Sequence, residues 1–158
     1  MGVKKIRYSE NGKYKSLSGK YIPLNPGKYK GKHPHPEYKS SLEYKMMKYL
    51  DKNSAILEWT YEPMAIEYYD NIRKKTRRYY LDFIAKTHVG GGFIKTILIE
   101  VKCKKETIEP KKTSRMSDKT YREAMKTWLT NNAKWAAAKK FAKAKNYEFV
   151  IINETHLS

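Results

Sequence analysis

The chain has 158 residues, 32% charged and 40% hydrophobic, a length and composition typical of one globular domain with its own core. Its 34 lysines and arginines outnumber 16 acidic residues, and the net charge of +18 favours a polyanion such as nucleic acid as partner over a merely solvated basic surface. We expect no membrane span, no secretory signal and, with a single cysteine, neither an internal disulfide nor a Cys/His zinc site.

Residues 1–39 differ in composition from the rest of the chain. They contain five of the eight glycines, four of the six prolines and ten of the 34 lysines and arginines, without apolar periodicity. We predict an extended basic N-terminal arm over residues 1–39, ordered only in part, and a folded domain over residues 40–158. The lysines of the arm suit contacts with DNA phosphates, and its tyrosines can stack on bases or pack down on the domain. The alternative is a solvated tail.

The first predicted helix begins after Ser40 and ends near Lys52. Its apolar side chains recur at helical spacing and form one face, made of Leu42, Met46, Tyr49 and Leu50. Ser40 and Glu43 have the spacing of a capping box, which favours a structural role for Glu43 at the helix N-terminus. Because Glu43 also borders the apolar face, a place in a buried site is the alternative.

Strands are predicted over residues 55–60 and 64–69, separated by Pro63, and a basic turn leads into the next strand. The cationic side chains of this turn and strand are Arg73, Lys74, Lys75, Arg77 and Arg78. Such a cluster suits a grip on DNA phosphates, the alternative being an exposed sheet edge protected by charge.

Two further apolar strands are predicted over residues 79–84 and 97–102, joined across a triple-glycine turn. The first carries Asp82, and the second ends in Glu100 and Lys102. Side chains alternate between faces along a strand, so Glu100 and Lys102 point the same way while the apolar residues between them face the core. Buried charge is costly unless it is paired or holds a metal, so these residues form the candidate catalytic site.

Beyond this strand the chain is first basic and then helical. Strand parity places Cys103 on the face opposite Glu100, where it is expected to pack. Apolar spacing predicts helices over residues 119–130 and 131–145 and a last strand over residues 147–152. The lysines of this part assigned to DNA contacts are Lys104, Lys105 and Lys134. The order of elements predicts an α/β fold with a mixed central sheet flanked by helices, whose last strand joins after a helical crossover.

The carboxylates of Asp82 and Glu100 on adjacent strands form a hard-oxygen site suited to Mg²⁺ or Mn²⁺, and the Val101 carbonyl is a further predicted ligand. A bound metal lowers the pKa of water and neutralises phosphate charge. Lys102 can orient that water, help to deprotonate it or stabilise the transition state. We therefore predict in-line hydrolysis of a phosphodiester, the alternative being a salt-bridged structural cluster.

Several stretches, taken together, resemble the head-completion nucleases of large tailed phages, a branch of the PD-(D/E)xK, restriction-endonuclease-like superfamily. The resemblance extends from about Gly19 to Asn153. It is carried by residues 19–23, 25–31, 41–43, 50–53, 75–82, 99–102, 104–107, 131 and 134–135. One departure is Leu81, which stands where the superfamily's name-giving proline precedes the aspartate.

The resemblance implies a restriction-endonuclease-like fold and a metal-dependent DNA endonuclease in which Asp82, Glu100 and Lys102 match the catalytic motif. It also favours a catalytic, metal-binding role for Glu43, because the superfamily often places an acid on the helix before the sheet. The implied setting is the virion or the host cytoplasm, with DNA as substrate, phage capsid, portal or neck proteins as partners, and a homodimer that cuts both strands. The alternatives are a non-catalytic DNA-binding virion protein and a nuclease for branched DNA or transposon ends.

Overall fold

The computed structural model describes residues 18–157. Over this range the chain forms two α-helices, α1 (Ser41–Lys52) and α2 (Asp118–Ala144). The strands are β1 (Gly19–Lys20), β2 (Glu37–Tyr38), β3 (Ile56–Tyr61), β4 (Ala65–Asp70), β5 (Lys75–Tyr80), β6 (Phe83–Val89), β7 (Phe93–Val101) and β8 (Glu148–Ile152). Short 3-10 turns are η1 (Pro26–Lys28), η2 (Gly90–Gly92) and η3 (Lys104–Thr107). Neither α-helix in the described range is both long and apolar enough to cross a membrane.

Four strands form the central sheet in the order β3-β6-β7-β8. β6 pairs antiparallel with both β3 and β7, and β8 pairs parallel with β7 after the chain has crossed through α2. The predicted α/β architecture, with a mixed sheet whose last strand joins after a helical crossover, is thereby confirmed.

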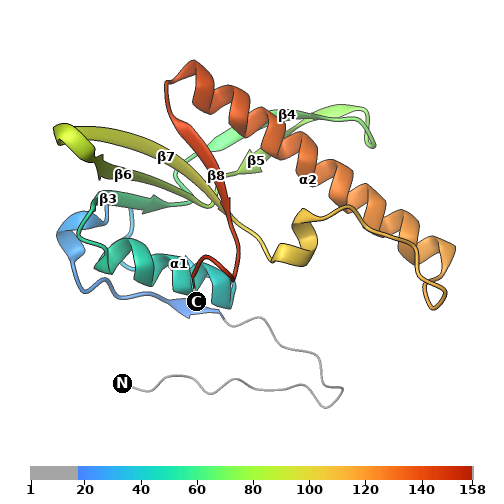
Figure 1. Ribbon diagram of the computed structural model, residues 1–158, viewed down its shortest axis with the longest axis horizontal. Coiled ribbons are helices and arrows are strands. Elements are labelled where there is room, and N and C mark those ends of the chain that lie inside the picture. The colour runs from blue at the N-terminus through green and yellow to red at the C-terminus, as the bar shows by residue number, and fades with distance from the viewer. Residues whose placement is uncertain (1–17, 158) are drawn as a thin grey trace, which may run out of the picture.

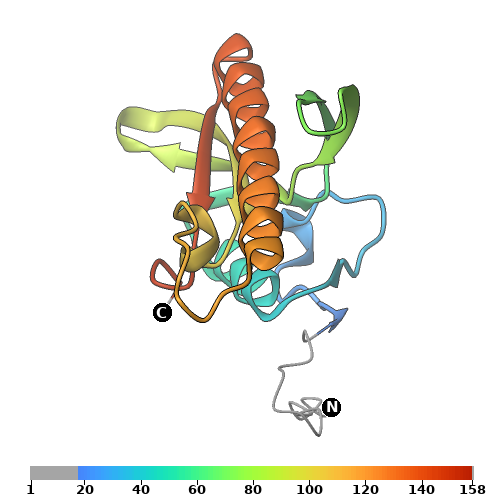
Figure 2. The same ribbon diagram turned by 90° about the vertical axis from the view of Figure 1, so that its right-hand side faces the viewer.

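The two helices cover opposite faces of the sheet (Figures 1 and 2). On one face, Met47 and Leu50 of α1 pack in a core that includes Ile99. On the other face, Ala138 of α2 packs in a core that includes Leu98. Leu98 and Ile99, which are neighbours in β7, thus pack on opposite faces of the sheet, as the alternation of side chains along a strand requires. Burying a leucine- or isoleucine-sized side chain contributes about 1.5–3 kcal/mol, so both layers hold β7 firmly.

The hairpin β4–β5 leaves the central sheet at a sharp bend, visible beside α2 in Figure 2. The outgoing chain turns at Glu62, which has a φ of 46°, and its N–H donates to the carbonyl of Asp82 on the returning chain at 2.7 Å. The strand predicted over residues 79–84 is therefore divided. It ends at Tyr80 and restarts at Phe83, which leaves Asp82 in the break.

Residues 18–39 pack on the domain instead of forming an extended arm. Tyr21 is buried, and its hydroxyl donates to the carboxylate of Asp51 in α1 at 2.6 Å. The backbone N–H groups of Leu24 and Asn25 donate to the same carboxylate at 2.7 and 3.0 Å. Packing of the arm's tyrosines on the domain, one of the roles expected for them, is thus found at Tyr21. The backbone contacts with Asp51 were not predictable, because no sequence pattern signals that a helix side chain is the acceptor for a distant loop. The remainder of that predicted arm, residues 1–17, lies outside the described residues.

The same segment completes the C-terminus of α1. The Lys28 ammonium donates to the carbonyls of Asp51 and Asn53 at 2.7 and 2.8 Å, two acceptors that the end of a helix leaves without intrahelical partners. Burial raises the pKa of the Asp51 carboxyl, but the hydrogen bonds from Tyr21, Leu24 and Asn25 outweigh it and hold that pKa below its usual range.

Two smaller predictions are also wrong. α2 is one continuous helix through Asn131, where a new helix was expected, and Asn131 is buried within it. Cys103 is exposed instead of packed, because β7 ends at Val101 and the alternation of faces ends with it.

Candidate functional site

Asp82 and Glu100 meet where two segments of the chain end. Asp82 lies in the break before β6, and Glu100 is the next-to-last residue of β7. Phe83 and Ile99 are register partners, which brings the residues beside them together. The two carboxyl groups lie close enough for the charge of Glu100 to raise the pKa of Asp82, and Glu100 is only 8% exposed. The structure therefore assembles the two predicted acids into one pair, in which Glu100 is buried and Asp82 half-buried.

Each acid of the pair is oriented by a second hydrogen bond. The N–H of Val101, beyond the last β6–β7 register pair, donates to Oδ2 of Asp82 at 2.9 Å. The hydroxyl of the buried Tyr79 donates to Oε2 of Glu100 at 2.5 Å. Because β5 and β7 hold these donors in place, the carboxyl oxygens are preorganised before any ligand arrives.

The pair is electrostatically costly on its own. Burial, and then the charge of Glu100, raise the pKa of Asp82 to about 8, despite the opposing hydrogen bond from Val101. Burial also raises the pKa of Glu100, opposed by its hydrogen bond from Tyr79 and the charge of Lys102. Two carboxyl groups this close, with little water around them, do not both ionise readily. With the pKa of Asp82 near 8, the site keeps a proton at neutral pH that a cation would displace.

The donor set fits a hard divalent cation. Asp82 and Glu100 supply carboxylate oxygens, and Val101 supplies a backbone carbonyl at the same strand end. Among residues 18–157 no group of three or more acidic, histidine or cysteine side chains is placed to hold a metal. Mg²⁺ is commonly held by one or two carboxylates together with water and substrate phosphates, so this two-carboxylate site suits it better than a metal that needs a cage of side chains.

The raised pKa of Asp82 makes stability depend on pH in a defined direction. The folded protein keeps a proton up to about pH 8, whereas an unfolded aspartate loses it near pH 3.9, about its ordinary pKa. Between these values the folded state binds more protons, so stability should fall as the pH rises. We expect the melting temperature in EDTA to decrease across this window and Mg²⁺ to reverse most of the decrease at the alkaline end. A melting temperature that rises with pH there, with no effect of Mg²⁺, would contradict the assignment.

Two lysines lie close to the acid pair. Lys102 follows β7 directly, and its charge lowers the pKa of Glu100. Lys134 of α2 places its ammonium over the rings of Tyr68 and Tyr79, at 5.8 and 6.0 Å from the ring centroids. Burial, and then the charge of Lys102, lower the pKa of the Lys134 ammonium, while Glu100 raises it. α2 thus adds a second cation beside the carboxylates.

The predicted cations of the β4–β5 hairpin divide between its faces. Arg73 and Arg77 pair with the buried Asp70, at 2.9 and 3.5 Å, and both repel Lys134 electrostatically. Asp70 therefore holds two arginines on the side of the site. Arg78 has the opposite parity to Arg77 and lies across from Glu67 on the other face. Lys74 lies in the turn and Lys75 begins β5, and both are exposed.

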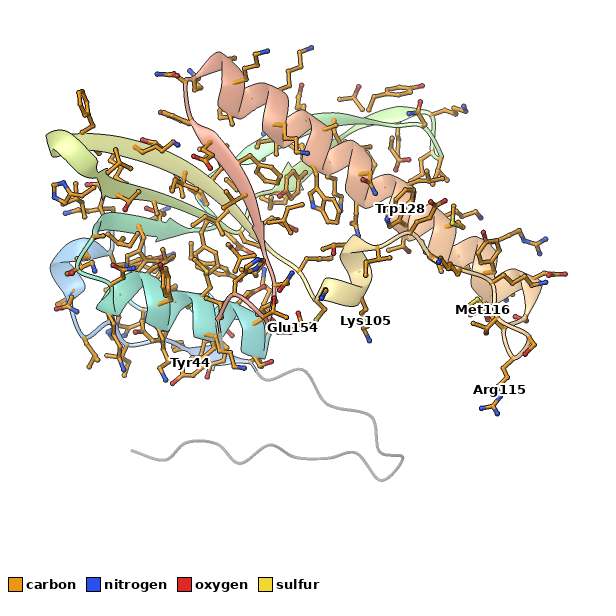
Figure 3. The ribbon with its side chains drawn as sticks, in the orientation of Figure 1. Tyr44, Lys105, Arg115, Met116, Trp128 and Glu154 are labelled. Atoms are coloured by element: carbon orange, nitrogen blue, oxygen red, sulfur yellow. The ribbon has the colours of Figure 1, made fainter. Side chains whose placement is uncertain are left out.

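Lys104 and Lys105 lie on η3, past the end of β7. The Lys104 N–H donates to the Glu154 carboxylate at 2.9 Å, which ties η3 to the segment after β8 (Figure 3). Lys105 lines a separate cavity of about 710 Å³ together with Met116 and Trp128. Both lysines therefore lie toward the projecting half of α2 and away from the hairpin.

Glu43 is held at the edge of the same site. Ser40 caps α1 by accepting the Glu43 N–H at 3.1 Å, but the Glu43 carboxylate does not return the bond to Ser40. It accepts the Lys39 N–H at 2.7 Å and the Tyr61 hydroxyl at 2.8 Å. Its charge contributes to the raised pKa of Asp82. Glu43 therefore combines a local bond at the helix start with electrostatic contact to the acid pair.

The sequence did not identify the tyrosines of the site. Tyr79 and Tyr61 each donate to a predicted catalytic acid, yet they resemble the many other tyrosines of a tyrosine-rich chain. The only hint in the sequence concerns Tyr79, which lies two residues after Arg77 and therefore on the same face of the strand. The partner acids are 21 and 18 residues away, so sequence spacing alone could not pair them.

Comparison with known proteins relates this chain to nucleases. A family model described as "TnsA-like endonuclease N terminal" matches residues 53–154, which include Asp82, Glu100 and Lys102 but not Glu43. The chain is similar to the head completion nuclease of Enterobacteria phage T4, with 36% identity over 145 residues. That alignment covers 90% of this chain and 94% of the relative.

Proposed function

Because this chain belongs to the TnsA-like endonuclease family, a family of restriction-endonuclease-like fold, we propose that it is a metal-dependent endonuclease that hydrolyses phosphodiester bonds of DNA. The observation that carries the proposal is the pair of Asp82 and Glu100, with Lys102 beside it. A fold without catalysis has no need to hold two repelling acids together, since such a pair lowers stability.

The residues of the site have distinct proposed roles. Asp82, Glu100 and the Val101 carbonyl would hold Mg²⁺, or Mn²⁺ in its place. Such an ion supplies a more acidic bound water and neutralises charge on the phosphate under attack. The Val101 N–H and the Tyr79 hydroxyl keep the two carboxylates turned inward. Lys102 would donate to the attacking water or to a phosphate oxygen, where a fixed cation favours the developing charge.

DNA would approach over the positive surface around the pair. Arg73 and Arg77, fixed by Asp70, and Lys134, fixed over two tyrosine rings, project from elements on the same side. Cations that are held in place lose little side-chain freedom when a phosphate binds. The exposed lysines assigned to DNA on the turn and on η3 would add longer-range attraction: Lys74, Lys75, Lys104 and Lys105. Arg78, on the other hairpin face, would contact DNA only if the duplex wrapped the hairpin.

The direct test is conversion of supercoiled plasmid to relaxed circles. We expect conversion with Mg²⁺ or Mn²⁺ and none with EDTA. DNA binding without cleavage under both metals would instead favour a non-catalytic DNA-binding protein that retains the fold. The charge of +18 suits both proteins equally, so binding alone does not separate them.

Glu43 is a proposed further ligand or positioning acid, and paired variants separate this role from helix capping. Ser40→Ala removes the cap and should cost about 1 kcal/mol of stability with activity unchanged. Glu43→Gln keeps the side-chain size but weakens the acceptor of Tyr61, and should lower metal-dependent cleavage by about 10–100-fold. Unfolding in urea and plasmid nicking measure the two effects. Full activity in Glu43→Gln with a stability loss equal to that of Ser40→Ala would leave Glu43 a structural residue only.

The biological role proposed for the nuclease is phage head completion, inside the host or the virion. It rests on similarity to the T4 protein across nearly the whole of that relative, more than on the family model. Capsid, portal or neck proteins as partners, and pairing of two copies to cut both strands, belong to the same proposal. A nuclease for branched DNA or transposon ends is the second candidate, which the TnsA-like description favours. Preference for junctions or for specific end sequences over ordinary duplex would identify it.

A further inference from the structure

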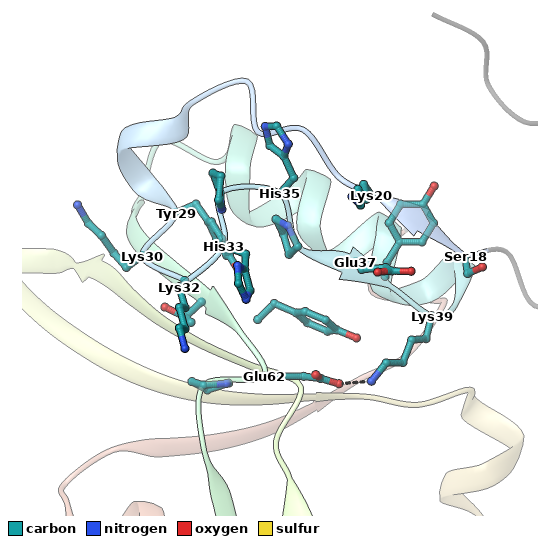
Figure 4. Close-up of a pocket in the computed structure, with 17 residues that line it drawn as sticks. Ser18, Lys20, Tyr29, Lys30, Lys32, His33, His35, Glu37, Lys39 and Glu62 are labelled. Carbon is teal, nitrogen blue, oxygen red and sulfur yellow. Dashed lines mark hydrogen bonds and ion pairs between the residues drawn. The ribbon is translucent and has the colours of Figure 1, made fainter.

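A basic, aromatic groove lies next to the acid pair, and nothing in the proposed reaction uses it. Its volume is about 890 Å³, within the range of sites that enclose a small ligand. One wall is the loop of residues 30–39, and the other includes Tyr61 and Glu62 at the end of β3 (Figure 4). We propose that this groove binds unpaired nucleotides of DNA, so that the enzyme acts where single strand and duplex meet. The inference rests on the proposed nuclease function and specifies its substrate.

The groove is joined to the catalytic site by two hydrogen bonds from its wall, and an ion pair links its two walls. The Lys39 ammonium pairs with the Glu62 carboxylate at 2.5 Å across the groove. The Glu62 N–H donates to the Asp82 carbonyl at 2.7 Å, so the groove wall and the catalytic break share a backbone bond. Tyr61 lines the groove and donates to Glu43 at 2.8 Å. A strand in the groove would therefore lie beside the chain segment that carries Asp82.

The chemistry of the walls suits a single strand better than a duplex. The cations that line the groove are Lys20, Lys30, Lys32 and Lys39, against the acids Glu37 and Glu62. Two flat rings stand exposed among these charges, His33 and His35 on the loop. The half-buried rings of Tyr29, Tyr38 and Tyr61 pack against the core and present only their edges to the groove. Single-stranded nucleic acid is held by this combination, because cations follow its phosphates and rings stack on its bases. In a duplex the base faces are already stacked on one another and cannot reach such rings.

Two pairs of substitutions test the groove, measured by fluorescence anisotropy in EDTA with labelled oligothymidine and, separately, a blunt duplex. Lys30→Ala with Lys32→Ala removes two groove cations, and Lys139→Ala with Lys140→Ala removes two exposed cations of α2 as the matched control. For the groove pair we expect the plot of log affinity for oligothymidine against log salt concentration to become less steep. The magnitude of its slope should decrease by about 0.7 for each phosphate that the variant no longer neutralises. Its duplex affinity should change no more than that of the control pair.

The second pair, His33→Ala with His35→Ala, removes the two exposed rings and leaves every lysine of the groove in place. We expect oligothymidine affinity to fall by about tenfold with the salt slope unchanged. The inference would be overturned if neither groove pair lowered the affinity for oligothymidine more than the control pair does. It would also be overturned if the affinities for duplex and for single strand fell equally. Plasmid nicking by the same proteins separates the two proposals. If the protein nicks DNA but the groove variants bind oligothymidine normally, only the groove proposal is rejected. If the groove binds oligothymidine but the wild type does not nick, the nuclease proposal is rejected.

Discussion

Replacing Asp82 by asparagine is expected to lower DNA cleavage by at least about a hundredfold, since changing even the partners of metal ligands costs about 10–100-fold. The loss should not arise from unfolding. The asparagine oxygen can still accept the Val101 N–H, and its amide can donate to Glu100. The variant should also be more stable than the wild type in EDTA at alkaline pH, because it no longer buries a repelling acid; each unit of raised pKa corresponds to about 1.4 kcal/mol.

The control for this result is Glu67→Gln, a neutralised acid that is exposed on β4. It should retain cleavage and show no gain in stability. Initial nicking rates and melting curves in EDTA and in Mg²⁺ supply both readouts. Wild-type activity in Asp82→Asn would remove this residue from the site. A loss of activity matched by an equal loss of folded protein would reduce it to a structural residue.

Replacing Asp51 by alanine is expected to cost about 3 kcal/mol or more of unfolding free energy, because hydrogen bonds to a buried charged group contribute about 1.5–3 kcal/mol each. The substitution leaves the Tyr21 hydroxyl and the Leu24 and Asn25 N–H groups without their acceptor. Residues 18–39 should then separate from α1. The lowered pKa of Asp51 also makes this effect depend on pH. The contribution of Asp51 to stability is present above the ordinary aspartate pKa, and it is lost as the pH falls through the lower pKa that Asp51 has in the folded protein.

Urea unfolding and limited proteolysis of the folded protein measure this prediction. Trypsin should cut at Lys20, Lys28 and Lys30 faster in the variant than in the wild type. Lys52→Ala, an exposed neighbour on α1, is the matched control and should change neither stability nor cutting by much. Equal stability losses in Asp51→Ala and Lys52→Ala would show that the carboxylate does not hold the segment.

Strand parity predicted the central feature of the site from sequence. Glu100 faces Asp82, while Ile99 and Val101 face α1, because period-two alternation follows from the strand backbone itself. The break at Asp82 was not predictable in this way. Residues 79–84 form one run of apolar and aromatic character, and what divides it is the turn at Glu62 on a different part of the chain.

The remaining differences have the same tertiary origin. Residues 18–39 look like a tail by composition, yet a single buried acceptor on α1 fixes their backbone. Asn131 looks like a helix start, since asparagine favours caps, but it is buried within α2, which continues through it. Local preference is a weak guide wherever a distant group satisfies the backbone or buries the side chain.

The parallel pairing of β8 with β7 bears on when during translation this protein becomes able to cut DNA. β7 carries Glu100 and Val101, and its outer edge is closed only by β8, with the Lys102 N–H donating to the Ile152 carbonyl at 2.9 Å. Both acids emerge from the ribosome well before residues 148–152 do. A nascent chain therefore presents its acids on an unsupported sheet edge, and the late arrival of β8 is expected to keep ribosome-bound chains from nicking nearby DNA.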